Sequence, residues 1–261
     1  MKVFLCLPVW LQLILVLGGS IGSVYVGMWL MHCKMKIPVN GAHNEITGYI
    51  FSVAGVLYAL LLAFLITAVW EGVNDVSNAV SREAAAIITI ARYSEEFPNP
   101  VRHQVYDQLR NYAELVINDE WKRMSQGNIE NNGSLRATVA LNNLYTIYRQ
   151  YPPAAVNSEA MRNLDDLSSR RILRLMSGGT QPLPRIVWIM LVSGAIIIIY
   201  FSMILYLENL RLHIFIVSLL TILIVMCLWS ILNLSNAFIG GLQVSPDALK
   251  YALHVIDTLP K

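Results

Sequence analysis

The feature that most constrains this chain is an uncharged apolar run over residues 48–70, followed by a stretch without proline that reaches residue 93. About 20 helical residues cross a bilayer, so the run predicts a transmembrane helix. Beyond it only Gly72 interrupts the helical pattern. We expect one helix that leaves the membrane as a stalk and carries a water-facing domain. Its apolar residues narrow to one stripe at three- and four-residue steps: Val73, Val76, Val80, Ala84, Ile87 and Ala91.

The composition is that of an integral membrane protein. Of the 261 residues, 56 % are hydrophobic and 14 % are charged, outside the range of ordinary soluble domains. The formal net charge is only +2 with dispersed basic residues, so the sequence gives no indication of a nucleic acid partner. Cys6, Cys33 and Cys227 lack the spacing of a zinc site or a disulfide framework, and we interpret them as packing residues.

The apolar segments predict two helical hairpins in the membrane, separated by a charged helical domain. The first segment is too long for a signal-peptide core and lacks a cleavage site, so we expect it to be retained. Proline and glycine breakers divide the charged region into the stalk and three further helices. The last of these helices is predicted to bury Leu164, Leu167, Ile172 and Leu175. The predicted boundaries are a transmembrane hairpin at 5–70 (helices 5–31 and 48–70), a soluble helical domain at 71–184 continuing from the second membrane helix, a transmembrane hairpin at 185–232, and a tail at 233–261 with a short amphipathic helix.

Charges near the predicted membrane ends give the orientation. Basic residues near the membrane are more numerous on the side of the helical domain and the termini, which the positive-inside rule makes cytoplasmic. We therefore predict an all-α integral membrane protein with four transmembrane helices and an inserted cytoplasmic helical bundle. The basic residues compared are Lys2, Arg82, Arg170, Arg171, Arg174, Arg185 and Lys250 on that side and Lys34, Lys36 and Arg211 on the other.

Small residues follow one side of the second membrane helix. They either line an ion path or allow close packing of a neighbouring helix, and the sequence leaves both interpretations open. No Asp, Glu, Lys or Arg falls within the spans, which argues against a proton-coupled transporter or a voltage sensor. The stripe consists of Gly48, Ser52, Gly55, Ala59 and Ala63.

Four polar residues follow where the same helix is predicted to leave the membrane. In a symmetric oligomer they would form rings at a pore mouth. The alternative is a solvated face of the stalk. These residues are Glu71, Asn74, Asp75 and Asn78.

No enzyme signature is present in the sequence. It has no phosphate-binding glycine loop, no nucleophile elbow and no His, Cys or Glu cluster with metal-ligand spacing. Adjacent carboxylates such as Asp165 and Asp166 point in different directions on a helix and do not form a calcium loop. We predict no catalytic residue, no metal site and no cofactor.

Several residues, in order and spacing, resemble a bacterial membrane-protein family known as the bestrophin-like domain, a domain of unknown function. Its layout is similar to that of bestrophins, which are pentameric anion channels with cytosolic helical domains. The chain departs from the family at Ser235 and Ala237, where an Asp and a Pro are expected, and it has no acidic cluster like the calcium clasp of animal bestrophins. The residues that carry the resemblance are His43, Asn44, Gly48, Gly55, Tyr58, Leu62, Ala63, Phe64, Trp70, Glu83, Ala84, Tyr112, Glu120, Trp121, Pro184, Trp188, Gly194, Phe238, Gly240, Val244 and Ser245.

The resemblance implies a bacterial inner-membrane ion channel that conducts anions, but it supplies no functional residues. Our own hypothesis is that the second membrane helix lines the path. The expected partners are membrane lipid, further copies of the chain and small inorganic ions. The alternative hypothesis is a non-conducting, membrane-anchored interaction or sensor module that acts through its helical domain. The two differ in whether the small residues of the second helix border water or only a neighbouring helix.

Overall fold

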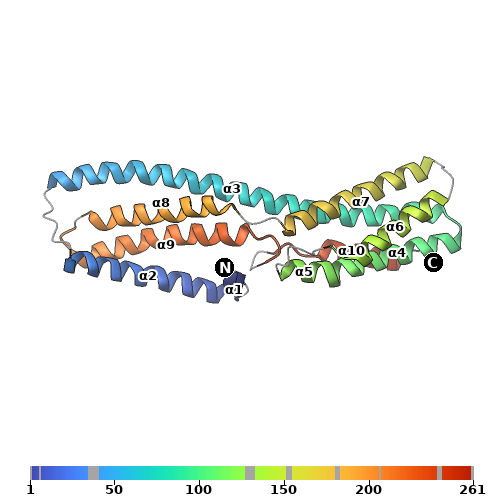
Figure 1. Ribbon diagram of the computed structural model, residues 1–261, viewed down its shortest axis with the longest axis horizontal. Coiled ribbons are helices and arrows are strands. Elements are labelled where there is room, and N and C mark those ends of the chain that lie inside the picture. The colour runs from blue at the N-terminus through green and yellow to red at the C-terminus, as the bar shows by residue number, and fades with distance from the viewer. Residues whose placement is uncertain are drawn as a thin grey trace. The chain divides into compact units, whose positions relative to one another are not determined.

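The computed structural model describes residues 2–5, 7–34, 41–126, 133–150, 155–179, 183–205, 207–239 and 243–259. Within these ranges the regular structure is entirely helical, which confirms the predicted all-α class (Figure 1). The elements are α1 (Lys2–Leu5), α2 (Val9–Lys34), α3 (Gly41–Tyr93), the 3₁₀ turn η1 (Ser94–Glu96), α4 (Asn99–Leu115), the π-helical turn η2 (Val116–Glu120), α5 (Trp121–Ser125), α6 (Leu135–Gln150), α7 (Ala155–Gly179), α8 (Arg185–Ile204), α9 (Leu210–Leu234) and α10 (Asp247–Thr258).

Four helices are long and apolar enough to cross a membrane, as predicted. They are α2, α3, α8 and α9. The first predicted segment is divided, because α1 ends at Leu5 and α2 begins only after Pro8. The Gln12 side chain bridges this break by donating to the carbonyl oxygens of Leu5 (3.2 Å) and Leu7 (2.9 Å). It also accepts a hydrogen bond from the Trp229 indole at 3.0 Å, which ties the break to α9.

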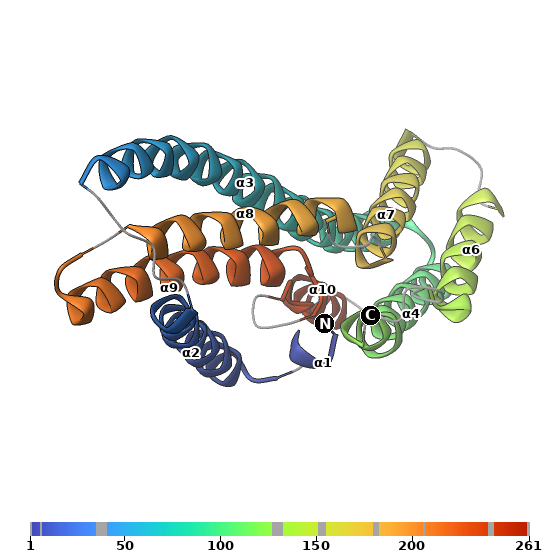
Figure 2. The same ribbon diagram turned by 60° about the vertical axis from the view of Figure 1, so that its left-hand side comes forward.

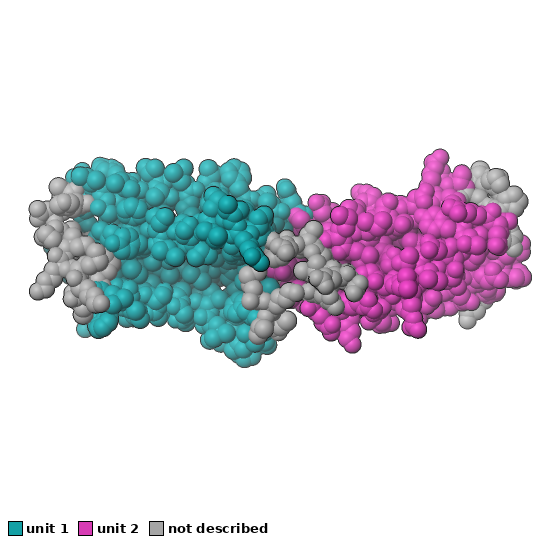
Figure 3. All heavy atoms as spheres, viewed as in Figure 1, with its two compact units in different colours: residues 1–71, 181–235 teal, residues 72–180, 236–261 magenta. Residues whose placement is uncertain are grey.

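The chain divides into two compact units (Figure 3). Unit 1 contains residues 1–71 and 181–235, and unit 2 contains residues 72–180 and 236–261. Helix α3 is continuous and contributes its first part to unit 1 and the remainder to unit 2. Helices α2, α8 and α9 and the first part of α3 therefore lie in unit 1, while most of the charged residues lie in unit 2.

Unit 1 is a bundle in which α9 packs against both α2 and α8 (Figures 1 and 2). The first part of α3 lies along α8, where the hydroxyl of Tyr58 donates to the carbonyl oxygen of Leu191 at 2.9 Å. Gly194 makes this approach possible, because a Cβ atom at that position would lie 2.6 Å from the Tyr58 ring. This contact fixes the side of α3 that faces its own bundle.

Unit 2 is built on the second part of α3. The predicted stripe is confirmed: Val76, Val80, Ala84 and Ile87 are buried in the main core of this unit, and Val73 packs against it. Helix α4 packs against α6 and α10, and α6 packs against α7. The amphipathic C-terminal helix thus completes the core of unit 2.

The predicted apolar face of the last domain helix was wrong at one position. Leu164 and Leu167 are buried in α7, but Ile172 is 53 % exposed. The inward positions of α7 after Leu167 are occupied by Arg171 and Arg174, both buried. Their partners are buried carboxylates, so an ionic cluster replaces apolar packing at this end of the helix.

We predict that Gly194→Ala lowers the thermal stability of the detergent-purified protein. The added methyl group meets the Tyr58 ring at 2.6 Å, and such overpacking costs about 1–3 kcal/mol. Gly18→Ala is the control, because no atom lies within 4 Å of a Cβ at that position. The melting temperatures of both variants are measured by circular dichroism. Equal melting temperatures would contradict the close packing of Gly194 against Tyr58.

Candidate functional site

The structure divides the small-residue stripe of α3 into two parts. Ser52, Ala59 and Ala63 are exposed, whereas Gly48 and Gly55 are half-buried. A Cβ at Gly48 would lie 4.0 Å from Leu205 of the same unit. Gly48 therefore lies toward the helix's own bundle, whereas a Cβ at Gly55 would meet no other atom within 4 Å and borders open space, like the three remaining positions.

The open side of α3 has two chemically different edges. Ser52, Ala59 and Ala63 recur at seven- and four-residue steps, and Thr67 continues the row, so these small side chains share one edge. The other edge carries large apolar side chains that are more than half exposed: Val53 (64 %), Leu57 (63 %) and Phe64 (67 %). A hydrocarbon environment suits the second edge, while the first presents small side chains and hydroxyl groups.

The predicted pore-mouth residues follow on the same helix. Glu71, Asn74, Asp75 and Asn78 are all exposed, and no hydrogen bond joins their side chains to other residues in the described parts of the chain. Asn74 and Asn78 continue the row of Ala63 and Thr67 at helical spacing. The exposed edge of α3 thus changes from small to polar along its length.

A buried ion-pair cluster, which is not among the features predicted from the sequence, holds the second part of α3. The guanidinium of Arg174 binds Glu83 of α3 through two hydrogen bonds, at 2.7 Å (Nε to Oε2) and 3.0 Å (Nη2 to Oε1). Its Nη2 also donates to Oε2 of Glu120 at 2.8 Å. All three side chains are fully buried. The Tyr112 hydroxyl donates to Glu83 Oε1 at 2.7 Å and completes the site.

Glu120 is held by a second guanidinium. Arg171 donates to Oε1 of Glu120 from Nη2 (2.6 Å) and from Nε (3.2 Å), and the backbone N–H of Ser134 donates to the same oxygen at 2.7 Å. Burial alone raises the pKa of Glu120, but the charges of Arg174 and Arg171 and their hydrogen bonds outweigh it, and the pKa is lowered. Two carboxylates and two guanidiniums make the cluster neutral in total.

The π-helical turn η2 places Glu120 in this cluster. A π turn adds one residue relative to an α-helix and shifts the side chains that follow it around the axis. Glu120 ends the turn and points inward, and Trp121 follows with its ring 5.7 Å from the Arg174 guanidinium and edge-on to Phe238 at 5.4 Å. The bulge thus brings a carboxylate and an indole to the same arginine.

A sequence signal for the cluster does exist. Glu83 interrupts the buried stripe between Val80 and Ala84, and Arg171 and Arg174 continue the spacing of the buried leucines of α7. In the prediction of orientation, both arginines stand among the charges that flank the membrane. Since Arg171 and Arg174 neutralise buried carboxylates, only the other basic residues remain as evidence for orientation.

In the parts of the chain that the structure describes, no group of three or more His, Cys, Asp and Glu side chains is arranged to hold a metal ion.

Comparison with known proteins gives one family and a set of similar structures. The sequence profile described as Bestrophin-like domain matches residues 18–249. A variant of a bacterial bestrophin homologue from Klebsiella pneumoniae superimposes with a TM-score of 0.74 at 11 % identity, covering 94 % of this chain and 99 % of that chain. Another crystal structure of that homologue has a TM-score of 0.67 at 14 % identity over 97 % of this chain and 100 % of that chain. No curated protein matches the sequence.

We predict that Glu120→Gln destabilises the protein by about 3–5 kcal/mol at pH 7, because it leaves buried guanidinium charge without its partner. Since the folded-state pKa of Glu120 lies below its ordinary value of 4.5, its contribution is present above that pH and is lost as the pH falls through the folded-state pKa. The stability difference between wild type and variant therefore shrinks on acidification below pH 4.5.

The matched control is Asp119→Asn. Asp119 pairs with Arg123 at 2.8 Å, and the two side chains are 31 % and 38 % exposed. A pair this exposed contributes less than about 1 kcal/mol. Thermal melts at several pH values compare the variants, and equal destabilisation by both would contradict the assigned role of Glu120.

Proposed function

This chain belongs to the Bestrophin-like family, and from that premise we propose that it forms an ion channel whose path runs along the small-residue edge of α3. Membership and the similarity to bacterial bestrophin homologues support the channel class. The observation that carries the path is the open side of α3. Of the 18 most apolar residues of α3, only 11 % are buried within the chain, and the corresponding shares for α2 (17 %), α8 and α9 (22 %) are only slightly higher.

An open side of this extent needs further partners. Lipid suits the edge with Val53, Leu57 and Phe64, whose large apolar side chains are compatible with hydrocarbon. The edge with Ser52 and Ala63 suits a water-filled path between copies of the chain, because small side chains leave room and no charge traps the ion. We therefore place several copies of α3 around a common axis, in a closed homo-oligomer.

Glu71, Asn74, Asp75 and Asn78 would form polar rings where this path opens. Acidic rings attract cations, whereas amide rings offer donors to anions and acceptors to cations. We propose that the conducted ions are anions. This proposal rests on the analogy with bestrophins and not on the chemistry of these four side chains.

The hydroxyl groups of the path do not decide its selectivity. Ser52 donates its proton to the carbonyl oxygen of Gly48 (2.9 Å), and Thr67 donates to that of Ala63 (3.0 Å). In this arrangement both oxygens offer lone pairs to the path, and a hydroxyl has to rotate before it can donate to an anion. Chloride and potassium must therefore be compared directly.

We further propose that the protein lies in a bacterial inner membrane, with unit 2 and both termini in the cytoplasm and with no enzymatic activity. The family supports the membrane location. The basic residues outside the buried cluster, among them Arg82, Arg185 and Lys250, support the orientation through the positive-inside rule.

We predict that wild-type protein in liposomes passes chloride faster than potassium, and that Ala63→Trp reduces this flux at least tenfold. The indole would occupy the path at an exposed position. Leu57→Trp is the matched control, because Leu57 lies on the lipid-compatible edge and is already large. Assembly of each variant is checked by size-exclusion chromatography with light scattering.

Two results would contradict the proposal. Equal flux through wild type and Ala63→Trp would show that the ion path does not run along this edge of α3. Absence of flux from correctly assembled protein, over a range of pH and calcium concentration, would favour the membrane-anchored interaction or sensor module instead.

A further inference from the structure

The open face of α3 does not end at the candidate pore mouth. Between residues 71 and 93 the exposed positions carry only small or polar side chains, and no large apolar side chain is exposed there. Ser77, Ser81 and Ala85 recur at four-residue steps and share one edge of the helix. Small and polar side chains suit water better than hydrocarbon. The water-compatible surface of α3 therefore continues beyond the four pore-mouth residues.

Charge is unevenly distributed along this face. The two exposed acids, Glu71 and Asp75, lie at its start. Glu83 is fully buried in the ion-pair cluster and adds no charge to the face. Between residues 76 and 91, all of which the structure describes, Arg82 is the only exposed charged residue of α3. The open face thus changes from acidic to basic along the helix.

Neighbouring acids do little to offset the charge of Arg82. Within the described residues no hydrogen bond or ion pair joins its exposed side chain to another group. Asp75 lies seven residues earlier, about 10 Å along the axis, which exceeds the Debye length of about 8 Å at physiological ionic strength. Arg92, the next exposed base of α3, is followed within four residues by Glu95 and Glu96. Arg82 is therefore the base whose guanidinium is most available to a passing ion.

The position of Arg82 connects it to the proposed path. It lies one helical turn beyond Asn78, which continues the row of Ala63 and Thr67. When copies of α3 surround a common axis, each copy contributes one guanidinium at this level, and rings of Arg or Lys favour anions in pores. We propose that Arg82 determines ion selectivity, through a ring of positive charge that concentrates anions just beyond the pore mouth. This inference rests on the proposed channel function.

The chemistry of the side chain suits this role. A guanidinium stays protonated at any physiological pH and donates through five N–H groups. Its stem is longer than that of Asp75, so the positive charge reaches farther from the helix than the nearest exposed negative charge does. The Asn78 amide, one turn earlier, offers two more N–H donors. A permeating anion thus meets donors on two successive turns, whereas a cation meets a repelling charge.

Selectivity is measured on the full-length protein in planar lipid bilayers, from the reversal potential in a KCl gradient. We expect Arg82→Gln to lower the permeability ratio of chloride to potassium at least about threefold, because each copy loses one charge from the path. Arg82→Lys should retain the wild-type ratio, and Arg82→Glu should lower it further than Arg82→Gln does. Between about 0.1 M and 1 M KCl the Debye length falls from about 10 Å to 3 Å, so the wild-type ratio should approach that of Arg82→Gln at high salt.

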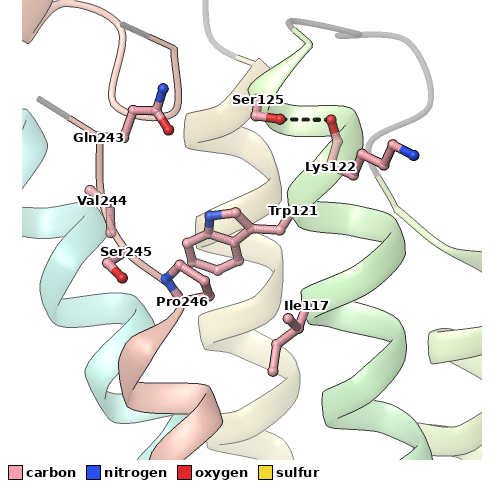
Figure 4. A pocket seen from close by; sticks show the side chains of 8 residues that line it. All are labelled: Ile117, Trp121, Lys122, Ser125, Gln243, Val244, Ser245 and Pro246. Atoms are coloured by element: carbon pink, nitrogen blue, oxygen red, sulfur yellow. Dashed lines mark hydrogen bonds between the residues drawn. The ribbon is translucent and has the colours of Figure 1, made fainter. Parts of the chain in front are cut away.

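Lys122→Gln is the matched control, because Lys122 is also exposed and has no ion pair within the described residues. It lies at the depression between α5 and the segment that precedes α10, with its side chain pointing away from Gln243 (Figure 4). None of the residues that line this depression belongs to α3. Loss of this charge should leave the permeability ratio unchanged. Assembly of each variant is checked by size-exclusion chromatography with light scattering.

Three results would overturn the role of Arg82 while leaving the channel in place. An unchanged ratio in Arg82→Gln would show that the residue does not act on selectivity. An equal loss in Lys122→Gln would assign the effect to the overall charge of unit 2, and an equal loss in Arg82→Lys would exclude charge as its cause. If wild type carries no current, the proposed channel function fails and this inference fails with it.

Discussion

The placement of Arg174 between Glu83 and Glu120 is the interaction on which unit 2 depends. Moving a guanidinium and two carboxylates out of water carries a large desolvation cost, which is offset only by short, multiple hydrogen bonds. The distances of 2.7–3.0 Å around Arg174 meet this requirement. Because the three residues belong to α3, η2 and α7, the cluster permits only arrangements of these elements that satisfy all of its charges. Apolar packing alone would tolerate small rotations of α7.

The π turn explains how a carboxylate and an indole, adjacent in sequence, both reach the same arginine. In a regular α-helix neighbouring side chains diverge by about 100°. The extra residue in Val116–Glu120 shifts the side chains that follow, and the ladder of hydrogen bonds is disturbed locally as a consequence. Contacts of both side chains with Arg174 stabilise this disturbance.

The sequence was sufficient for the all-α class and the four spans because these follow from length and apolar periodicity along single helices. It was insufficient where partners come from distant segments. Ile172 was assigned to the buried face since it is apolar, but Arg174 takes the inward position because Glu83, 91 residues away, is there to pair with it. Pro8 could have revealed the break before α2, whereas no residue pattern distinguishes the five-residue π turn from an α-helix. Periodicity indicates which face of a helix a residue lies on, but it does not indicate which side chains of other segments pack against that face.

The same limit explains the division of the small-residue stripe. Small size at Gly48 and Ala63 permits both helix packing and a water-filled path, and sequence spacing alone does not separate these uses. Tyr58 sets which side of α3 meets α8, through its hydrogen bond to Leu191 and its contact with Gly194. Gly48 then lies toward the bundle, and Ala63 is exposed. Under the proposed function, selectivity for an ion would therefore depend on the side of α3 that its own chain leaves open and on the residues that further copies place opposite that side.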